Sequence, residues 1–338
     1  MSGLLGSLPP EQVRLLSVAR PGRELAARPM TATLSDRREF SARWIFERKL
    51  DGVRMLAVRE AGTVTLVSRS GRRVDGSYPE IAAALAAQER ADFTVDGEIV
   101  AFTHGRTDFG LLQRRMGLTR AAEVAASGVA VTYCVFDVLR LDGADTTGLP
   151  LRTRKSLLRR ALTYRTPLRF TPHRNAGGTD LLAQACARGW EGLIAKRADS
   201  RYQPRRSPDW LKLKCSRGQE FVIGGFTEPA GGRTGFGALL LGHYADGVLR
   251  YAGKVGTGFP SRTLTVLRTR LDGLRRPDSP FGDRVTERHP RWVEPSLVAQ
   301  VEFAEWTRDG MLRHPRFIGL RDDKRPQDVV REEAGPPP

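Results

Sequence analysis

The composition of the sequence changes near residue 215, and this change most limits the folds open to the chain. Before residue 215, patterns typical of strands and helices alternate, and after it short strand patterns are separated by glycine-rich breaks. One expected helix, at 261–272, interrupts these short strands. Such a pattern favours a small barrel of the OB-fold type. We therefore expect an α+β protein, with antiparallel sheets and helices in a first domain and an OB-fold β-barrel after it.

The expected boundaries follow the same patterns. Residues 1–27 form an N-terminal extension, 28–215 the first domain and 216–330 the barrel domain, with a polar hinge at 215–220 and a disordered tail at 331–338.

Local signals predict the elements of the first domain. Asp51-Gly52 separates two strand patterns, as in a meander, and Ser77 to Glu80 match a capping box that opens a helix. The expected strands lie at 43–48, 53–59, 63–69, 93–102, 129–143, 192–197 and 210–214. The expected helices lie at 79–88, 109–116, 119–126, 151–162 and 180–189.

The charge balance favours a polyanionic partner. The chain has 55 Lys and Arg against 38 Asp and Glu, a formal net charge of +17. Nucleic acid is the simplest such partner, and positive charge scattered along the chain fits a broad groove better than a basic tail. A basic surface without such a partner is the alternative. No stretch approaches the ~20 apolar residues of a membrane span, so we expect a soluble, intracellular protein with no membrane partner.

Cysteine and histidine spacing gives no sign of a metal site. Cys134, Cys186 and Cys215 are far apart and odd in number, so we expect the reduced thiols of a cytosolic protein. The five histidines show no paired spacing, and a zinc site is therefore not expected.

A lysine follows a buried strand pattern in "ERKLDGVRM", residues 47–55. Alone, Lys49 could be a surface lysine before an Asp-Gly turn. Lys212 and Lys214 in "WLKLKC" point to one face, because side chains alternate along a strand. Half-buried like charges repel and are stabilised by an anion between them, for which a triphosphate is the natural candidate.

Two acids and an aromatic residue complete the pattern. Glu98 in "VDGEIV" and Glu191 in "WEGLIAKR", which also contains Lys196, would bind Mg²⁺ that bridges phosphate oxygens. Phe136, expected with Asp137 at the end of a buried strand, could stack on a base. Each residue also fits an ordinary role: the acids as solvated strand ends, the aromatic as core, the lysines as guards of an edge strand. Their occurrence together favours the functional interpretation.

In this order the motifs resemble those of the covalent nucleotidyltransferases, specifically the ATP-dependent DNA ligases. The resemblance spans about residues 28–330 and is closest to the bacterial end-joining ligases, including the ligase module of polymerase–ligase fusions. The matching segments are KLDGVR at 49–54, SRSGR at 68–72, DGE at 96–98, FDVL at 136–139, EGLIAK at 191–196, LKLK at 211–214 and RDDK at 321–324.

The resemblance implies a reaction and a role for each residue. Lys49 would attack the α-phosphate of ATP to form lysyl-AMP, and AMP would pass to the 5′-phosphate of a nick before the adjacent 3′-OH displaces it. Desolvation and neighbouring positive charge would lower the pKa of Lys49. The implied contacts are Glu47 to adenine, largely through its backbone, Phe136 and Ile194 to the two faces of the adenine ring, Arg54 and Glu98 to ribose, with Arg54 also reaching phosphate, Lys196 to the nucleotide, Glu98 and Glu191 to Mg²⁺ or Mn²⁺, Lys212 and Lys214 to the α-phosphate, Arg69 to the nick 5′-phosphate, and Arg321 and Lys324 to pyrophosphate.

The implied partner is nicked double-stranded DNA in the bacterial cytoplasm, during repair or end joining. About 27 residues precede the resemblance, too few for the helical DNA-binding domain of many DNA ligases. We therefore also expect a partner such as the end-bridging protein Ku or a repair polymerase. Two other functions stay open: an RNA ligase or GTP-using capping enzyme with the same lysine chemistry, and a basic OB-type nucleic-acid binder without catalysis.

Overall fold

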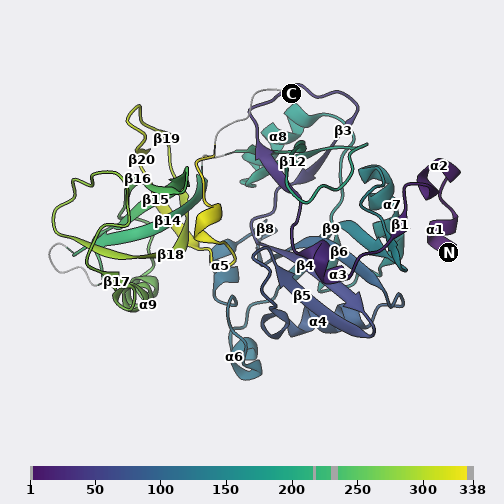
Figure 1. The fold of residues 1–338 in the computed structure, drawn as a ribbon, viewed down its shortest axis with the longest axis horizontal. Helices are drawn as coiled ribbons and strands as arrows, with labels where there is room; N and C mark the ends of the chain where they lie inside the picture. Colours follow the sequence, from purple (N-terminus) through teal and green to yellow (C-terminus); the bar gives the residue numbers. More distant parts are fainter. Residues whose placement is uncertain (1–2, 216–217, 230–234, 333–338) are drawn as a thin grey trace. The chain divides into compact units, whose positions relative to one another are not determined.

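The computed structural model describes residues 3–215, 218–229 and 235–332, which fall into two compact units divided after Cys215. The division lies where the composition of the sequence changes. Each unit, drawn as a ribbon in Figure 1, contains helices and strands. Each also has its own hydrophobic core. Of the expected hinge, residues 216–217 lie outside the described residues, as do residues 333–338 of the expected tail.

The larger sheet of the first unit has seven strands in the order β1-β10-β9-β6-β4-β5, with β11 pairing with β9. All neighbours are antiparallel except β11 and β9. One face packs against helices α4, α5 and α7. The strands are β1 (Ser17–Val18), β4 (Val53–Glu60), β5 (Thr63–Ser68), β6 (Phe93–Val100), β9 (Thr132–Leu141), β10 (Ala144–Asp145) and β11 (Leu168–Phe170). The helices are α4 (Pro79–Ala86), α5 (Phe109–Gln113) and α7 (Leu151–Ala161).

The smaller sheet of this unit has the order β2-β13-β12-β3, which makes β3 an edge strand. Helix α8 (Gly178–Ala187) covers one face with Leu182 and Ala185. On the other face, Trp210 shares a buried cluster with Phe136 of the larger sheet, so the two sheets pack face to face. The strands are β2 (Thr31–Leu34), β3 (Trp44–Arg48), β12 (Gly192–Arg197) and β13 (Arg206–Lys214).

The N-terminal residues belong to the cores of the first unit. Leu4 and Leu5 join the core of the larger sheet, and Leu25 joins the cluster between the sheets. The remaining elements of the unit are short: α1 (Gly3–Gly6), α2 (Pro10–Val13), α3 (Gly22–Ala26), α6 (Ala121–Ala126), a 3₁₀ turn at Asp75–Ser77, and the hairpin of β7 (Phe102–Thr103) and β8 (Arg106–Thr107).

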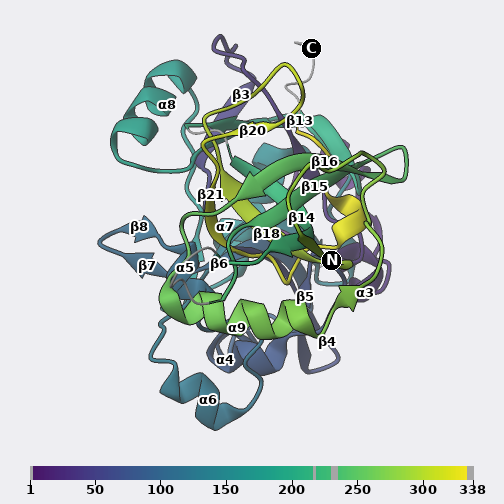
Figure 2. The same cartoon turned by 90° about the vertical axis from the view of Figure 1, so that its left-hand side faces the viewer.

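The second unit is the β-rich domain of OB type expected from the sequence. Its main sheet has the order β16-β15-β14-β18-β17, and β21 pairs with another part of the long strand β18. Helix α9 (Ser261–Asp272) lies at one end of this sheet in both views (Figures 1 and 2) and buries Leu267 and Leu271 in its core. The strands are β14 (Gly218–Thr227), β15 (Leu239–Ala245), β16 (Val248–Val255), β17 (Arg275–Arg276), β18 (Pro290–Glu302), β19 (Glu305–Trp306), β20 (Leu312–Arg313) and β21 (Arg316–Leu320), and a 3₁₀ turn spans Pro326–Asp328. No helix in the described ranges is long and apolar enough to cross a membrane.

The meander predicted across Asp51-Gly52 is wrong. Strand β3 lies in the smaller sheet and β4 in the larger one, so the turn connects two sheets. An Asp-Gly pair signals a turn but does not say which sheet the next strand joins. Gly52 is needed here for close approach, since a Cβ at this position would lie 2.2 Å from the carbonyl oxygen of Ile99.

The capping box predicted at Ser77 to Glu80 is also absent. Tyr78 occupies the N-cap of α4, and no side chain caps the helix. Glu80 instead accepts two hydrogen bonds from Arg115, at 2.8 and 2.9 Å, and Arg115 also donates to the carbonyl of Ser77 at 2.9 Å. The buried side chain of Arg115 thus binds the Glu80 carboxylate, which in a capping box would accept a hydrogen bond from the backbone at the start of the helix.

The prediction of three reduced thiols is wrong for two of them. Cys186, on α8, forms a disulfide with Cys215, the residue after β13, while Cys134 is free and buried. The two cysteines are 29 residues apart, a spacing with no recognisable signal. Folding brings them together because Trp190 donates to the carbonyl of Ala185 at 2.9 Å, which turns the chain from α8 into β12, the neighbour of β13.

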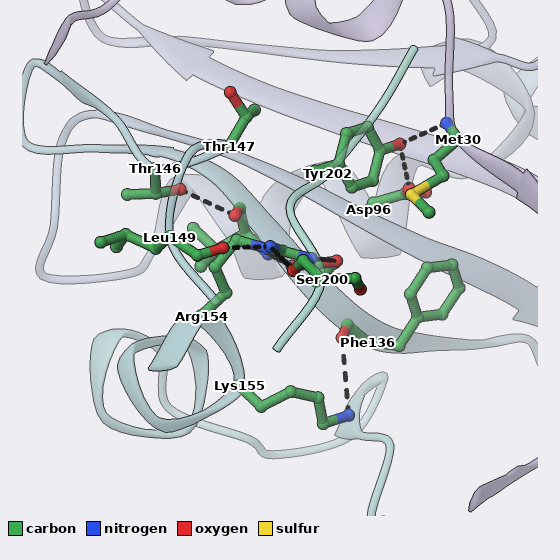
Figure 3. Close-up of polar contacts among 12 residues, drawn as sticks. Met30, Asp96, Phe136, Thr146, Thr147, Leu149, Arg154, Lys155, Ser200 and Tyr202 are labelled. Atoms are coloured by element: carbon green, nitrogen blue, oxygen red, sulfur yellow. Dashed lines mark hydrogen bonds and ion pairs between the residues drawn. The ribbon is translucent and has the colours of Figure 1, made fainter. Parts of the chain in front are cut away.

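A fully buried ion pair holds α7 against the larger sheet. Arg154 on α7 donates to both carboxylate oxygens of Asp137 on β9, at 2.8 and 2.9 Å, and neither side chain is exposed. Arg154 also donates to the carbonyl of Ser200 at 2.9 Å (Figure 3). A buried charge without its partner is strongly destabilising.

We expect Arg154→Met to lower the free energy of unfolding of the first unit by about 3–5 kcal/mol, because it leaves the Asp137 carboxylate buried and unpaired. Urea unfolding followed by circular dichroism measures the change. Arg197→Met is the matched control: Arg197 pairs with Asp199 at the surface, and its loss should cost less than about 1 kcal/mol. Equal small losses in both variants would contradict a structural role for the buried pair.

Candidate active site

Lys49 lies at the end of β3, where the chain leaves the smaller sheet. Its backbone N–H donates to the carbonyl of Gly192 at 2.9 Å, and its amine forms an ion pair with Glu191. Burial alone would lower the pKa of Lys49, but Glu191, Asp51 and Glu98 raise it above the ordinary lysine value. The prediction of a lowered pKa is therefore wrong for this state, because three carboxylates outweigh desolvation around the amine.

The acids beside Lys49 fit a divalent cation. Among the residues described, Glu191 Oε2 is buried without a hydrogen-bond partner, although its other oxygen contacts Lys49. Glu98 is close enough to contribute to the pKa of Lys49. No group of three or more acids, histidines or cysteines in the described ranges could hold a metal. Two carboxylates suit Mg²⁺, which takes its remaining ligands from water and substrate phosphates.

Glu47, two residues before Lys49, is buried between two lysines. Lys196 on β12 lies 2.7 Å from Glu47 Oε2, and Lys155 on α7 contacts Oε1. Burial raises the pKa of Glu47, but the two lysines together bring it below its ordinary value. Burial lowers the pKa of Lys196. The role of Lys155 could not be read from the sequence, where it is one of several basic residues of an amphipathic helix.

A second buried network surrounds Arg54 and Phe136. Arg54 donates from Nε and Nη2 to the two oxygens of Asp96, each at 2.5 Å, and its guanidinium lies 4.5 Å from the centre of the Phe136 ring. Lys196 lies 4.2 Å from the same ring centre. Tyr202 donates to Asp96 at 2.6 Å (Figure 3). Asp96 belongs to the matching segment DGE, but neither Asp96 nor Tyr202 was predicted from the sequence as a site residue.

Phe136 was predicted at the end of a strand, which is incorrect. Strand β9 continues to Leu141, and Phe136 lies in its middle with only 8% of its surface exposed. The apolar pattern of residues 129–143 predicts a strand. It does not indicate which residue of that strand a ligand could contact.

The strands of the smaller sheet align the other predicted residues in rows. Ile194 on β12 pairs with Glu47 on β3 and with Lys212 on β13, and Gly192 pairs with Lys214. Lys212 and Lys214 are half-buried, whereas Leu211 and Leu213 of the opposite face are buried in the core beneath α8. The predicted placement of the two lysines on one face is confirmed.

Three predicted residues do not belong to these rows. Arg69 follows β5, and its side chain makes no hydrogen bond or ion pair with another residue that the structure describes. Arg321 and Lys324 lie in the second unit. Arg321 donates to Asp323 at 2.9 and 2.8 Å, and Lys324 lies 3.0 Å from Glu220. Their roles toward pyrophosphate stay predictions.

Each of the two units matches a known protein family. Residues 25–214 match the model of the ATP dependent DNA ligase domain, and residues 232–324 match that of the ATP dependent DNA ligase C terminal region. The chain is 41% identical over 305 residues to the multifunctional non-homologous end joining protein LigD of Pseudomonas aeruginosa, covering 87% of this chain and 36% of that protein. It is 33% identical over 298 residues to a probable DNA ligase of Streptomyces coelicolor, covering 84% of this chain and 57% of that protein.

A solved structure supports the same assignment. The mycobacterial DNA ligase D complexed with ATP and MES has 36% sequence identity and a TM-score of 0.64, covering 90% of this chain and 98% of that one. The chain spans little more than a third of the length of the LigD protein it matches. The domain match covers more than half of the chain and contains Lys49, Glu98 and Glu191 in their expected motifs, so the chain belongs to the family of ATP-dependent DNA ligases.

Proposed function

We propose that this protein uses ATP to seal 5′-phosphate/3′-OH nicks in double-stranded DNA through a lysyl-AMP intermediate. The observation that carries the proposal is the gathering of Lys49 and two acids, Glu47 and Glu191, with the lysines of β13 at the smaller sheet. Lys49 contacts Glu191, and Glu47, Ile194 and Lys212 align across three strands beside it. The likeness to LigD supports a role in end joining, with Ku or a repair polymerase as the proposed partner.

The Lys49 amine would attack the α-phosphorus of ATP, and pyrophosphate would leave. Because the ion pair with Glu191 favours the protonated amine, Lys49 must lose a proton before it attacks. AMP would then pass to the 5′-phosphate of the nick, and attack by the 3′-OH would form the phosphodiester and release AMP. Lys212 and Lys214, both half-buried, would offset the charge that develops on the α-phosphate.

The buried networks would form the nucleotide site. Glu47, whose side chain is held by Lys196, would contact adenine largely through its backbone, and Phe136 and Ile194 would cover the faces of the adenine ring. Arg54 is fixed by Asp96 and would reach the ribose together with Glu98. Glu98 and Glu191 would hold Mg²⁺ or Mn²⁺, which when bound neutralises phosphate charge.

Incubation with ATP and a divalent cation should increase the mass of the protein by one AMP, and Lys49→Ala should abolish this increase. Lys49→Arg should fail as well, because a guanidinium stays protonated and cannot attack. Intact-protein mass spectrometry measures the adduct. Labelling with GTP in place of ATP tests the capping alternative, and an adduct on Lys49→Ala would place the nucleophile elsewhere.

Removal of divalent cations with EDTA should stop formation of lysyl-AMP, and Glu191→Gln should raise the Mg²⁺ concentration needed for half-maximal adduct. The reason is that one of two carboxylate ligands is removed. Titration of Mg²⁺ against adduct yield measures the shift. Glu123→Gln, which removes a partly exposed acid paired with Arg120, is the control and should titrate as the unmodified protein does. Equal Mg²⁺ titration curves for the unmodified protein, Glu191→Gln and Glu123→Gln would exclude Glu191 as a metal ligand.

Arg69→Ala should leave lysyl-AMP formation intact and slow nick sealing by about 10- to 100-fold, as expected when one hydrogen bond to a charged group is removed. Gel assays of both steps at one ATP concentration separate the effects. Arg73→Ala is the nearby control, because Arg73 is already paired with Asp75. Loss of lysyl-AMP in Arg69→Ala would instead place Arg69 at the nucleotide.

A further inference from the structure

Three arginines gather around two aromatic rings at the end of β3. Two of them lie over the ring of Trp190: the guanidinium of Arg48 is 4.4 Å from its centre and that of Arg188 is 5.5 Å away. The ring centre of Phe102 lies 5.3 Å from the guanidinium of Arg169 and 6.0 Å from that of Arg48. Planar guanidinium groups stack on aromatic faces, so the rings hold the arginines in place.

Arg106 joins this group from the β7–β8 hairpin. A Cβ added at Gly189 would lie 2.9 Å from Arg106 Nη1, which places the guanidinium against the backbone beside Trp190. Arg48 donates from Nη1 to the carbonyl of Gly105 in the same hairpin, at 3.1 Å. Residues from β3, the hairpin, β11 and the end of α8 therefore form one surface, the arginine cluster: Arg48, Arg106, Arg169 and Arg188.

The charge of the arginine cluster is uncompensated within the described residues. None of its four members forms an ion pair there, in contrast to Arg54 and Arg154, which each bind a carboxylate. Nε and Nη2 of Arg48 are buried without hydrogen-bond partners among the same residues. Burial, and then the charge of Arg169, lower the pKa of Arg48. The positive charges of neighbouring arginines repel one another, and a bound anion would stabilise them.

The position of the cluster identifies the anion. Alternate side chains of β3 face opposite sides, so Arg48 points away from the side of Glu47 and Lys49. The row of Glu47, Ile194 and Lys212 therefore lies on the other face of the sheet. Arg106, Arg169 and Arg188 are exposed to solvent. Three exposed arginines at separate points suit a series of phosphates better than one compact triphosphate.

We propose that the arginine cluster binds the phosphodiester backbone of a DNA strand beside Lys49. This proposal rests on the proposed function, because it names where the DNA substrate is held. The rings orient the guanidinium groups and do not read bases, so the binding is independent of sequence. The cluster would contribute to the affinity for nicked DNA in proportion to the phosphates it binds.

The test compares Arg106→Gln/Arg188→Gln with the unmodified protein in binding a labelled, unsealable nicked duplex at several salt concentrations. The slope of log affinity against log salt should become less steep by about 0.9 for each phosphate that is no longer neutralised, or about 1.8 for two phosphates. Arg106→Lys/Arg188→Lys keeps both charges and should keep the slope. Arg120→Gln/Arg197→Gln removes the same net charge from arginines already paired with Glu123 and Asp199, and should also keep it.

A slope for Arg106→Gln/Arg188→Gln equal to that of the paired-arginine control would overturn the proposal. An unchanged slope with a higher ATP requirement for lysyl-AMP formation would also overturn it and assign the cluster to nucleotide phosphates. Should the double variant fail to fold, as judged by circular dichroism, Arg169→Gln alone should reduce the slope by about 0.9. Binding is measured without sealing, so a protein that binds through the cluster but forms no lysyl-AMP would contradict the proposed function and leave this inference standing.

Discussion

The carboxylate of Glu47 joins three elements that the rest of the first unit depends on. It binds Lys155 of α7 and Lys196 of β12 from its own position on β3, and all three side chains are at most 3% exposed. Lys155 also donates to the carbonyl of Thr171 at 2.7 Å. Three buried charges are stable together only while they remain paired, so this arrangement fixes the edge strand that ends at Arg48, next to Lys49.

Successive side chains at the end of β3 face opposite sides of the smaller sheet. Glu47 and Lys49 face the larger sheet, where Phe136, Arg54 and Asp96 form a buried network. Arg48 lies between them and faces the other way, toward Trp190. Because β3 is at the edge of its sheet, a side chain near its end can extend past the sheet to the β7–β8 hairpin. The adjacent residues Arg48 and Lys49 therefore serve different surfaces. Lys49 lies on the side that faces the larger sheet, and Arg48 belongs to the arginine cluster.

Local periodicity was enough to predict most elements of the fold. Strand β12 and helix α9 have the bounds expected at 192–197 and 261–272, and the alternation of Lys212 and Lys214 gave their common face. Partners distant in the sequence could not be predicted. Lys155 lies 108 residues from Glu47, and Tyr202 lies 106 residues from Asp96, so no local pattern connects them. The pKa of Lys49 was predicted in the wrong direction for the same reason, since it depends on which charges the fold brings to the amine.

The bond between Cys186 and Cys215 turns part of the first unit into a covalent ring. The ring contains β12 and β13 and with them Glu191, Lys196, Lys212 and Lys214. A single cut in the backbone between the two cysteines would leave both pieces attached to each other through the sulfur atoms. The chain entering from α8 and the chain leaving toward the second unit would then still be one molecule, held together by a bond that a reductant can open.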